Sequence, residues 1–143
     1  MKQIYSDLWQ TRAEHPFLEV TSHAYLLVRD TGNILLYSSG LHEEHQHIQK
    51  LGGITHQYLS HSDEAGPALA EIKELFGSKL CCHRLEEPAV SKAAPVDCMF
   101  DKRETMRATS RSYLRRVTLL VAYAFWSLQL TERHIFSPET PSF

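Results

Sequence analysis

The chain has 143 residues, a length that suits one small domain. Hydrophobic residues make up 43% of it and charged residues 22%, as in an ordinary soluble globule, and the formal net charge is -2. That balance gives no case for nucleic acid or a membrane as a partner. Residues 1–7 lack the apolar core of a secretory signal, so we expect a cytoplasmic protein.

The first part of the chain predicts β-structure. Residues 3–11 alternate in polarity and indicate a first strand. Residues 23–28 and 34–37 are apolar, β-prone runs. They are separated by turn residues that include Gly32 and Asn33, both of which tolerate a positive φ, so we expect a β-hairpin.

Strands and helices alternate from residue 34 to residue 83. The expected elements are a helix over 42–51 stopped by Gly52-Gly53, a strand over 54–59, a helix over 67–76 opened by Pro67 and capped by Gly77, and a strand over 79–83. This alternation implies βαβ units and an α/β layer.

Histidines and cysteines need separate interpretations. The first expected helix carries His42, His45 and His47 among charged residues, which is typical of a solvated face. His56 and His83 are interpreted as strand-face and packing residues.

The three cysteines are Cys81, Cys82 and Cys98. An odd count without a signal peptide favours reduced thiols. The adjacent pair Cys81-Cys82 has two interpretations: a contribution to a metal site, or small residues in a buried strand, which we favour.

The composition changes after Glu104. Gly, Asp, Asn and Lys disappear, while Arg recurs. Residues 117–130 are strongly apolar but shorter than the ~20 residues that a membrane span needs. We therefore expect two parts: a domain over residues 1–104 and an atypical tail over residues 105–143.

A succession of segments resembles the N-terminal half of the metallo-β-lactamase fold superfamily. The segments are 23–28, 31–37, 51–54, 58–61, 67–76 and 80–83. The resemblance covers roughly residues 3–104 and depends on the order of the segments more than on one motif. It implies an α/β fold, a partial αββα sandwich of which this chain supplies about half.

That family carries His-x-His-x-Asp-His on the loop after the strand at 54–59. These groups hold two divalent ions, usually zinc, which convert a bound water into a hydroxide nucleophile. Matched residue by residue, His61 takes the first His position and Asp63 the second. Ala65 and Gly66 stand where the Asp and the last His belong. The resemblance thus implies His61 and Asp63 as metal ligands, for zinc first and for iron or manganese as alternatives.

The family's later segments, Pro-Gly-His-Thr-Pro-Gly and Gly-Asp-Thr, are absent from residues 105–143. A permitted back-translation of residues 113–126, read from the third base of its first codon, gives Pro-Thr-Pro-Gly-His-Thr-Pro-Gly-Ser-Val-Cys-Phe-Leu. A permitted back-translation of residues 134–143, read at the same offset, gives Tyr-Leu-Phe-Thr-Gly-Asp-Thr-Leu-Phe. We infer a truncated product whose reading frame changes near residues 104–106.

Three functions compete. The resemblance implies metal-dependent hydrolysis of a small-molecule ester, thioester, lactam or phosphodiester, with this truncated chain itself inactive. The second is a non-catalytic module that kept the fold and lost the ions. The third is a membrane- or partner-binding peptide made of residues 105–143.

Overall fold

The computed structural model of the chain describes residues 1–101. The expected boundary near residue 104, the tail over residues 105–143 and the reading-frame change lie outside these residues. Within the described part, no helix has the length and apolarity that crossing a lipid bilayer requires.

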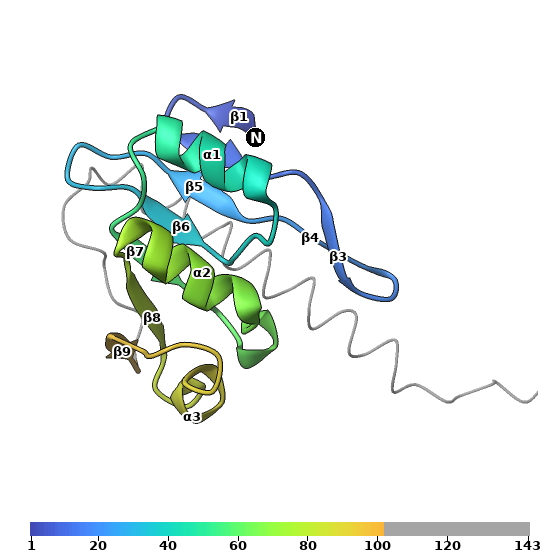
Figure 1. Ribbon diagram of the computed structural model, residues 1–143, viewed down its shortest axis with the longest axis vertical. Helices are drawn as coiled ribbons and strands as arrows, with labels where there is room; N and C mark the ends of the chain where they lie inside the picture. The colour runs from blue at the N-terminus through green and yellow to red at the C-terminus, as the bar shows by residue number, and fades with distance from the viewer. Residues whose placement is uncertain (102–143) are drawn as a thin grey trace, which may run out of the picture. The chain divides into compact units, whose positions relative to one another are not determined.

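Over residues 1–101, seven strands form one mixed sheet (Figure 1). In spatial order they are β1 (Lys2–Tyr5), β2 (Leu8–Gln10), β5 (Tyr25–Leu27), β6 (Ile34–Leu36), β7 (His56–Tyr58), β8 (Lys79–His83) and β9 (Cys98–Phe100). Pairs from β1 to β6 are antiparallel, and pairs from β6 to β9 are parallel. A separate hairpin joins β3 (Glu14–Phe17) to β4 (Val20–Ser22). The predicted α/β class is confirmed.

The strand predicted over residues 3–11 is two strands. β1 and β2 pair antiparallel, with Gln3 opposite Trp9, and Ser6 and Asp7 form the turn between them. A turn of two polar residues leaves the alternation of polarity intact, so the pattern alone does not reveal the reversal. Ser and Asp favour such turns because their side chains bond nearby backbone groups.

The predicted hairpin is present as β5 and β6, with Leu26 opposite Leu35. Gly32 in its turn has a φ of 112°, and a Cβ there would lie 2.5 Å from Cγ2 of Thr55. Only glycine fits this position, because both the backbone conformation and the space exclude a side chain.

Asn33 has a different role from the predicted one, because its backbone adopts no positive φ. Its Nδ2 donates hydrogen bonds to the carbonyl oxygens of Leu51, at 2.8 Å, and Gly53, at 2.9 Å. Its Oδ1 accepts a bond of 2.9 Å from the amide of Arg29. One buried side chain therefore ties the hairpin turn to the end of the first helix.

Helices α1 (His42–Lys50) and α2 (Pro67–Phe76) lie side by side on one face of the sheet (Figure 1). Both agree with the predicted ranges. Gly52 and Gly53 follow α1 with φ values of 103° and 71°, and Gly77 ends α2 with a φ of 63°. Left-handed glycines at these positions stop the helices as the sequence predicts.

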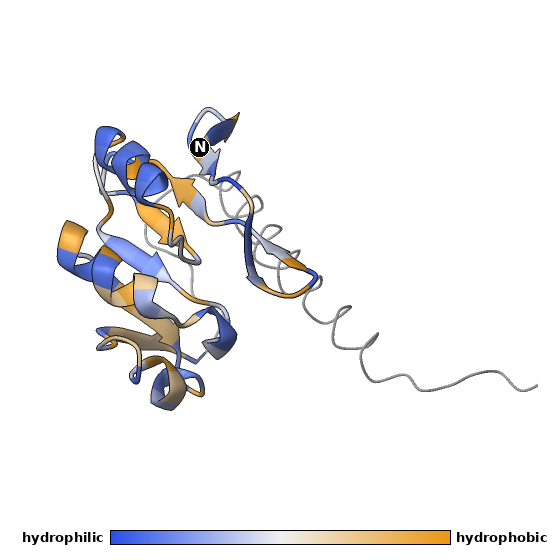
Figure 2. Cartoon of the chain, turned by 45° about the vertical axis from the view of Figure 1, so that its right-hand side comes forward, coloured by the Kyte–Doolittle hydropathy of each residue, from blue (hydrophilic) through white to orange (hydrophobic). Residues whose placement is uncertain are grey.

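The main core lies between these helices and the sheet. Ile48 of α1 and Ile72 of α2 are fully buried against Leu26 and Leu35. Burial of each such side chain contributes about 1.5–3 kcal/mol. Figure 2 shows the apolar strands β5 and β6 beneath the largely hydrophilic α1.

A second cluster of buried apolar side chains packs around β8. Its fully or nearly fully buried members include Leu59, Leu69, Leu80 and Val90, the last from the short helix α3 (Glu87–Val90). Because Leu59 opens the loop after β7, this cluster fixes the base of the loop that the resemblance marks as a metal site.

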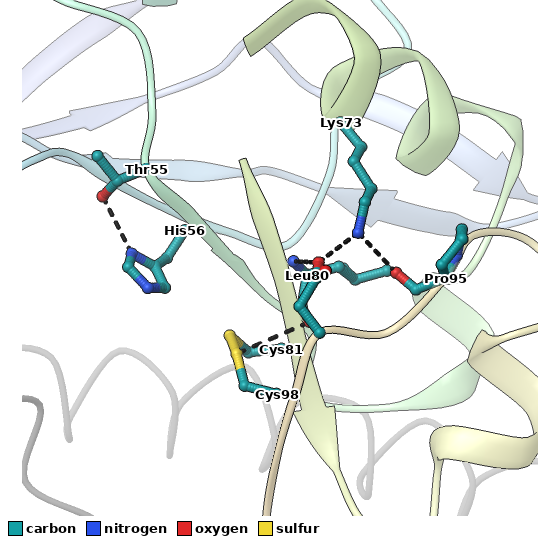
Figure 3. Close-up of a disulfide and its surroundings, with 8 residues drawn as sticks. Thr55, His56, Lys73, Leu80, Cys81, Pro95 and Cys98 are labelled. Carbon is teal, nitrogen blue, oxygen red and sulfur yellow. Dashed lines mark hydrogen bonds and ion pairs between the residues drawn. A yellow bond between two sulfur atoms is a disulfide. The ribbon is translucent and has the colours of Figure 1, made fainter. Parts of the chain in front are cut away.

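Cys81 of β8 and Cys98 of β9 form a disulfide (Figure 3). The expectation of reduced thiols is wrong for these two residues, because parallel pairing places them directly opposite one another. Cys82 is a free, buried thiol in the second cluster. Successive strand residues point to opposite faces, so Cys81 and Cys82 do not share a metal.

Candidate metal-binding and active site

The loop over residues 59–66 lies at the carboxyl edge of the parallel strands. The register places Leu36 of β6 beside Tyr58 of β7, and Tyr58 beside Cys81 of β8. In α/β sheets, ligands bind outside the carboxyl ends of the strands. The loop therefore occupies the place where the sequence predicts chemistry.

Glu64 holds this loop in shape. It ends the single 3-10 turn η1 (Ser62–Glu64) and is 8% exposed. Its Oε2 accepts a hydrogen bond of 2.9 Å from the amide of Ser60, and its Oε1 accepts one from the Ser60 hydroxyl. Burial raises the pKa of the Glu64 carboxyl, and the bonds from Ser60 offset part of that rise. Both oxygens are thus engaged within the loop.

Glu86 is a site residue that sequence reasoning missed. It lies just after β8, and its Oε2 accepts a hydrogen bond of 2.9 Å from the amide of Ser62. The bond from Ser62 lowers the pKa of Glu86, with further lowering by the charges of His61 and His83. The available signal was an acidic residue three positions after a strand that ends at the same edge.

Tyr37 is a second missed residue at this edge. It follows β6 with a φ of 72°, a conformation that costs a non-glycine residue about 1–3 kcal/mol. Its amide donates to the carbonyl of Tyr58 at 2.9 Å, and its carbonyl accepts from Nε2 of Gln57 at 3.1 Å. Burial raises the pKa of its hydroxyl, against a hydrogen bond with Ser22.

His61 and Asp63, the two predicted ligands, lie close together. Nδ1 of His61 is 3.4 Å from Oδ2 of Asp63, and the two side chains are 41% and 62% exposed. The amide of Asp63 also donates a hydrogen bond of 3.1 Å to the same Nδ1. In neutral His61 the proton is therefore on Nε2, and Nδ1 serves as the cap of η1.

These two residues fit a hydrolytic zinc centre only in part. A catalytic zinc takes three protein ligands and one open position. Within residues 1–101, no third His, Cys, Asp or Glu donor converges on His61 and Asp63. This pair therefore offers fewer protein donors than the three that a catalytic zinc takes.

Three donors do converge elsewhere, at His42 and His45 of α1 and Glu71 of α2. Their ligand atoms all lie within 4.8 Å of one another. The predicted solvated face is wrong for His45, which is 2% exposed and has Nε2 2.7 Å from the carbonyl oxygen of Ser39. The helix pattern did not reveal this burial because it depends on α2 and on the loop before α1.

His56 and His83 behave as predicted. The ring of His83 packs edge-on against Phe100, with centroids 5.7 Å apart. His56 lies on β7, stacks on Tyr58 at 6.2 Å, and has Nδ1 3.0 Å from Oγ1 of Thr55. Burial lowers the pKa of His56, which favours its neutral form.

Comparison with solved structures identifies the fold. A metallo-β-lactamase from Pontibacter korlensis is similar over 75% of this chain and 54% of its own, with a TM-score of 0.61 and 14% identity. A Cronobacter sakazakii metallo-β-lactamase described by a HARLDQ motif is similar over 75% and 50%, with a TM-score of 0.61 and 14% identity. A metallo-β-lactamase from Hirschia baltica is similar over 76% and 55%, with a TM-score of 0.55 and 9% identity.

The class defined by this architecture is therefore the metallo-β-lactamase fold, which the resemblance predicted. The chain spans about half the length of the structures it matches, and that partial coverage fits an N-terminal half. No family model matches the chain, and no curated protein matches it.

Proposed function

We propose that the loop over residues 59–66 is the metal site of a hydrolase fold, and that His61 and Asp63 bind its divalent ion. The ion proposed is zinc, with iron or manganese as alternatives. The substrate class proposed is a small ester, thioester, lactam or phosphodiester. This chain by itself does not hydrolyse that substrate.

One observation carries the proposal: at the carboxyl edge of the parallel strands, Nδ1 of His61 lies 3.4 Å from Oδ2 of Asp63. To bind an ion at this position, Nδ1 would release the hydrogen bond that it accepts from the Asp63 amide. An imidazole and a carboxylate are suitable donors for zinc, iron and manganese. Inactivity follows from their number, because hydrolytic zinc needs a third protein ligand. The family's later ligand segments are proposed to have been lost with the reading frame.

The test is zinc titration of the full chain by calorimetry, without reductant so that the disulfide stays intact. His42→Ala serves as the background, because it removes the exposed histidine of the group formed by His42, His45 and Glu71. Adding His61→Ala is expected to weaken the remaining zinc binding at least tenfold. Adding His15→Ala, an exposed histidine on β3, is the matched control and leaves zinc binding unchanged.

Hydrolysis is measured on the same proteins with a chromogenic β-lactam and a chromogenic phosphodiester. We expect rates equal to those of buffer with zinc. Zinc-dependent turnover that disappears on His61→Ala would refute the proposed inactivity and support a working site. Zinc binding insensitive to His61→Ala would refute the assignment of the ligand.

The second candidate is a non-catalytic module without metal. It is favoured by the use of the nearby carboxylates as backbone caps: Glu64 binds Ser60, and Glu86 binds Ser62. On this alternative, purified protein contains no stoichiometric metal, and EDTA leaves its melting temperature unchanged. Stoichiometric zinc that EDTA removes from the His42→Ala background would contradict it.

A further inference from the structure

We propose that His42, His45 and Glu71 form a metal site that joins α1 to α2 and binds Zn²⁺ or a similar late first-row divalent ion. None of these ligands belongs to the loop over residues 59–66, so the site is additional to the one proposed above. The same three residues supply two imidazole nitrogens and one carboxylate oxygen.

The helices bring the donors together by their spacing. His42 and His45 are three residues apart on α1, which places them on one face of the helix. Glu71 lies in α2, and α2 runs beside α1 on the same face of the sheet (Figure 1). Oε1 of Glu71 is 3.3 Å from Nδ1 of His42 and 3.7 Å from Nδ1 of His45.

Two of the three separations suit donors around one ion. Four ligands at the corners of a tetrahedron, with bonds of about 2.0–2.1 Å to zinc, lie about 3.3 Å from one another. The observed 3.3 Å between His42 and Glu71 equals that value, and the 3.7 Å between His45 and Glu71 needs only a small adjustment.

The proton of His45 is placed for metal binding. Its Nε2 lies 2.7 Å from the carbonyl oxygen of Ser39. A carbonyl only accepts hydrogen bonds, so Nε2 carries the proton and donates it. The Nδ1 lone pair is left free and faces Glu71. Ligating histidines usually have this arrangement, with the other ring nitrogen donating to a carbonyl or carboxylate.

The buried Nδ1 of His45 is a second reason to expect a bound cation. It has no hydrogen-bond partner among the described residues, and the His45 side chain is 2% exposed. Its lone pair faces the negative charge of Glu71 at a distance too long for a hydrogen bond. Two electron-rich groups held this way repel one another unless a positive charge lies between them.

The donor set selects the kind of ion. Two imidazoles and one carboxylate favour zinc, cobalt, nickel or copper over magnesium and calcium, which prefer oxygen ligands. The side chains of His42 and Glu71 are 83% and 45% exposed, so the fourth position is open to water. A bound ion would cross-link α1 to α2.

The experiment titrates Zn²⁺ alone, and Co²⁺ alone, into the full chain in the His61→Ala background without reductant. That background removes the proposed loop site. A negative result therefore concerns the site on α1 and α2 alone and does not bear on the loop over residues 59–66. We expect one zinc per chain, d–d absorption bands of tetrahedral cobalt, and a zinc-dependent rise in melting temperature. His42→Ala and Glu71→Gln, both at exposed positions, each weaken zinc binding at least tenfold and abolish the cobalt bands.

His15→Ala is the matched histidine control, and Glu74→Gln is the control on α2; both keep the wild-type affinity. His45→Ala is left out because its burial makes misfolding a competing explanation. Zinc affinity unchanged by both His42→Ala and Glu71→Gln would overturn the proposal. Absence of saturable zinc binding at neutral pH would also overturn it.

Discussion

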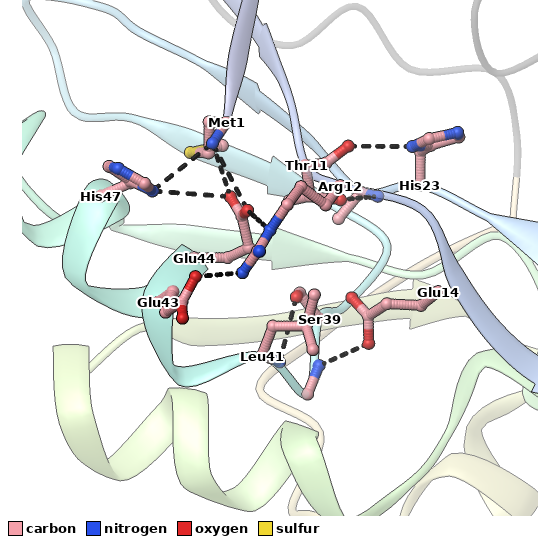
Figure 4. A network of polar contacts seen from close by, with 12 residues as sticks. Met1, Thr11, Arg12, Glu14, His23, Ser39, Leu41, Glu43, Glu44 and His47 are labelled. Carbon is pink, nitrogen blue, oxygen red and sulfur yellow. Dashed lines mark hydrogen bonds and ion pairs between the residues drawn. The ribbon is translucent and has the colours of Figure 1, made fainter.

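Nε of Arg12 donates a hydrogen bond of 3.1 Å to Oε1 of Glu44, a carboxylate whose side chain is completely buried on α1 (Figure 4). The amino group of Met1 lies 3.1 Å from the other oxygen. Burial alone would raise the pKa of Glu44, but the amino group and Arg12 outweigh it, and the net pKa is lowered. The buried charge is thus retained because two cations surround it.

Glu44→Gln is expected to destabilise the fold by about 1.5–3 kcal/mol at pH 7, the range for hydrogen bonds to charged groups. Glu43→Gln is the matched control. Glu43 bonds the same Arg12 but is 70% exposed, so its loss costs less than about 1 kcal/mol. Urea unfolding of the three proteins gives the comparison. Equal costs for the two variants would contradict the role assigned to Glu44.

The same carboxylate predicts an acid sensitivity. A group whose folded pKa lies below its unfolded value contributes stability above the unfolded pKa of 4.5, and that contribution is lost as pH falls through the folded pKa. The difference in stability between wild type and Glu44→Gln should therefore shrink as pH is lowered from 5 towards 3. A constant difference would show that Glu44 acts without its charge.

The hydrogen bonds of Asn33 predict that its substitution lowers the free energy of unfolding. Its amide donates to Leu51 and Gly53, and its side-chain oxygen accepts from Arg29. Asn33→Asp keeps the acceptor, removes both donors and places a charge against two carbonyls. We expect a loss of about 2–4 kcal/mol, one to two hydrogen bonds with their desolvation cost. Thermal melting measures this loss of stability. A loss below about 1 kcal/mol would contradict the role of Asn33 in tying the hairpin turn to the end of α1.

The disulfide predicts a thiol count. Denatured protein without reductant should expose one reactive thiol, that of Cys82, and after reduction all three cysteines should react. Because the bond closes a loop of 17 residues, its reduction should lower stability by about 3 kcal/mol. Thiol titration and urea unfolding provide both measurements. Three reactive thiols before reduction would refute the bond.

The encoding DNA tests the proposed change of reading frame. Codons 113–126 and 134–143, read from the third base of their first codons, should spell Pro-Gly-His-Thr-Pro-Gly and Gly-Asp-Thr. Nucleotides that spell neither in that offset frame would end the hypothesis. If they do spell them, restoring the frame is expected to add the family's later ligand segments, but not the two ligands that Ala65 and Gly66 replace.

Local signals explain what the sequence predicted well. The bounds of α2 agree with Pro67 at its start and Gly77 at its end, because both residues act through their own backbone. The loop carrying His61 was placed correctly because it follows an apolar strand and precedes that helix. Neither inference needed a distant partner.

Long-range pairing explains what was missed. β9 and the Cys81–Cys98 bond depend on β8 meeting a segment 17 residues away. The burial of His45 depends on Glu71 and on the carbonyl of Ser39, which no helical pattern reveals. These features arise only when separate elements pack together.

The bond between β8 and β9 has one further consequence. It encloses the exposed Leu85, which is 82% accessible, in a covalent ring with α3. A protease that cuts the chain after Leu85 therefore opens the ring without releasing a fragment. Such a nicked molecule would migrate as intact protein on a non-reducing gel and separate into two pieces only when a thiol is added.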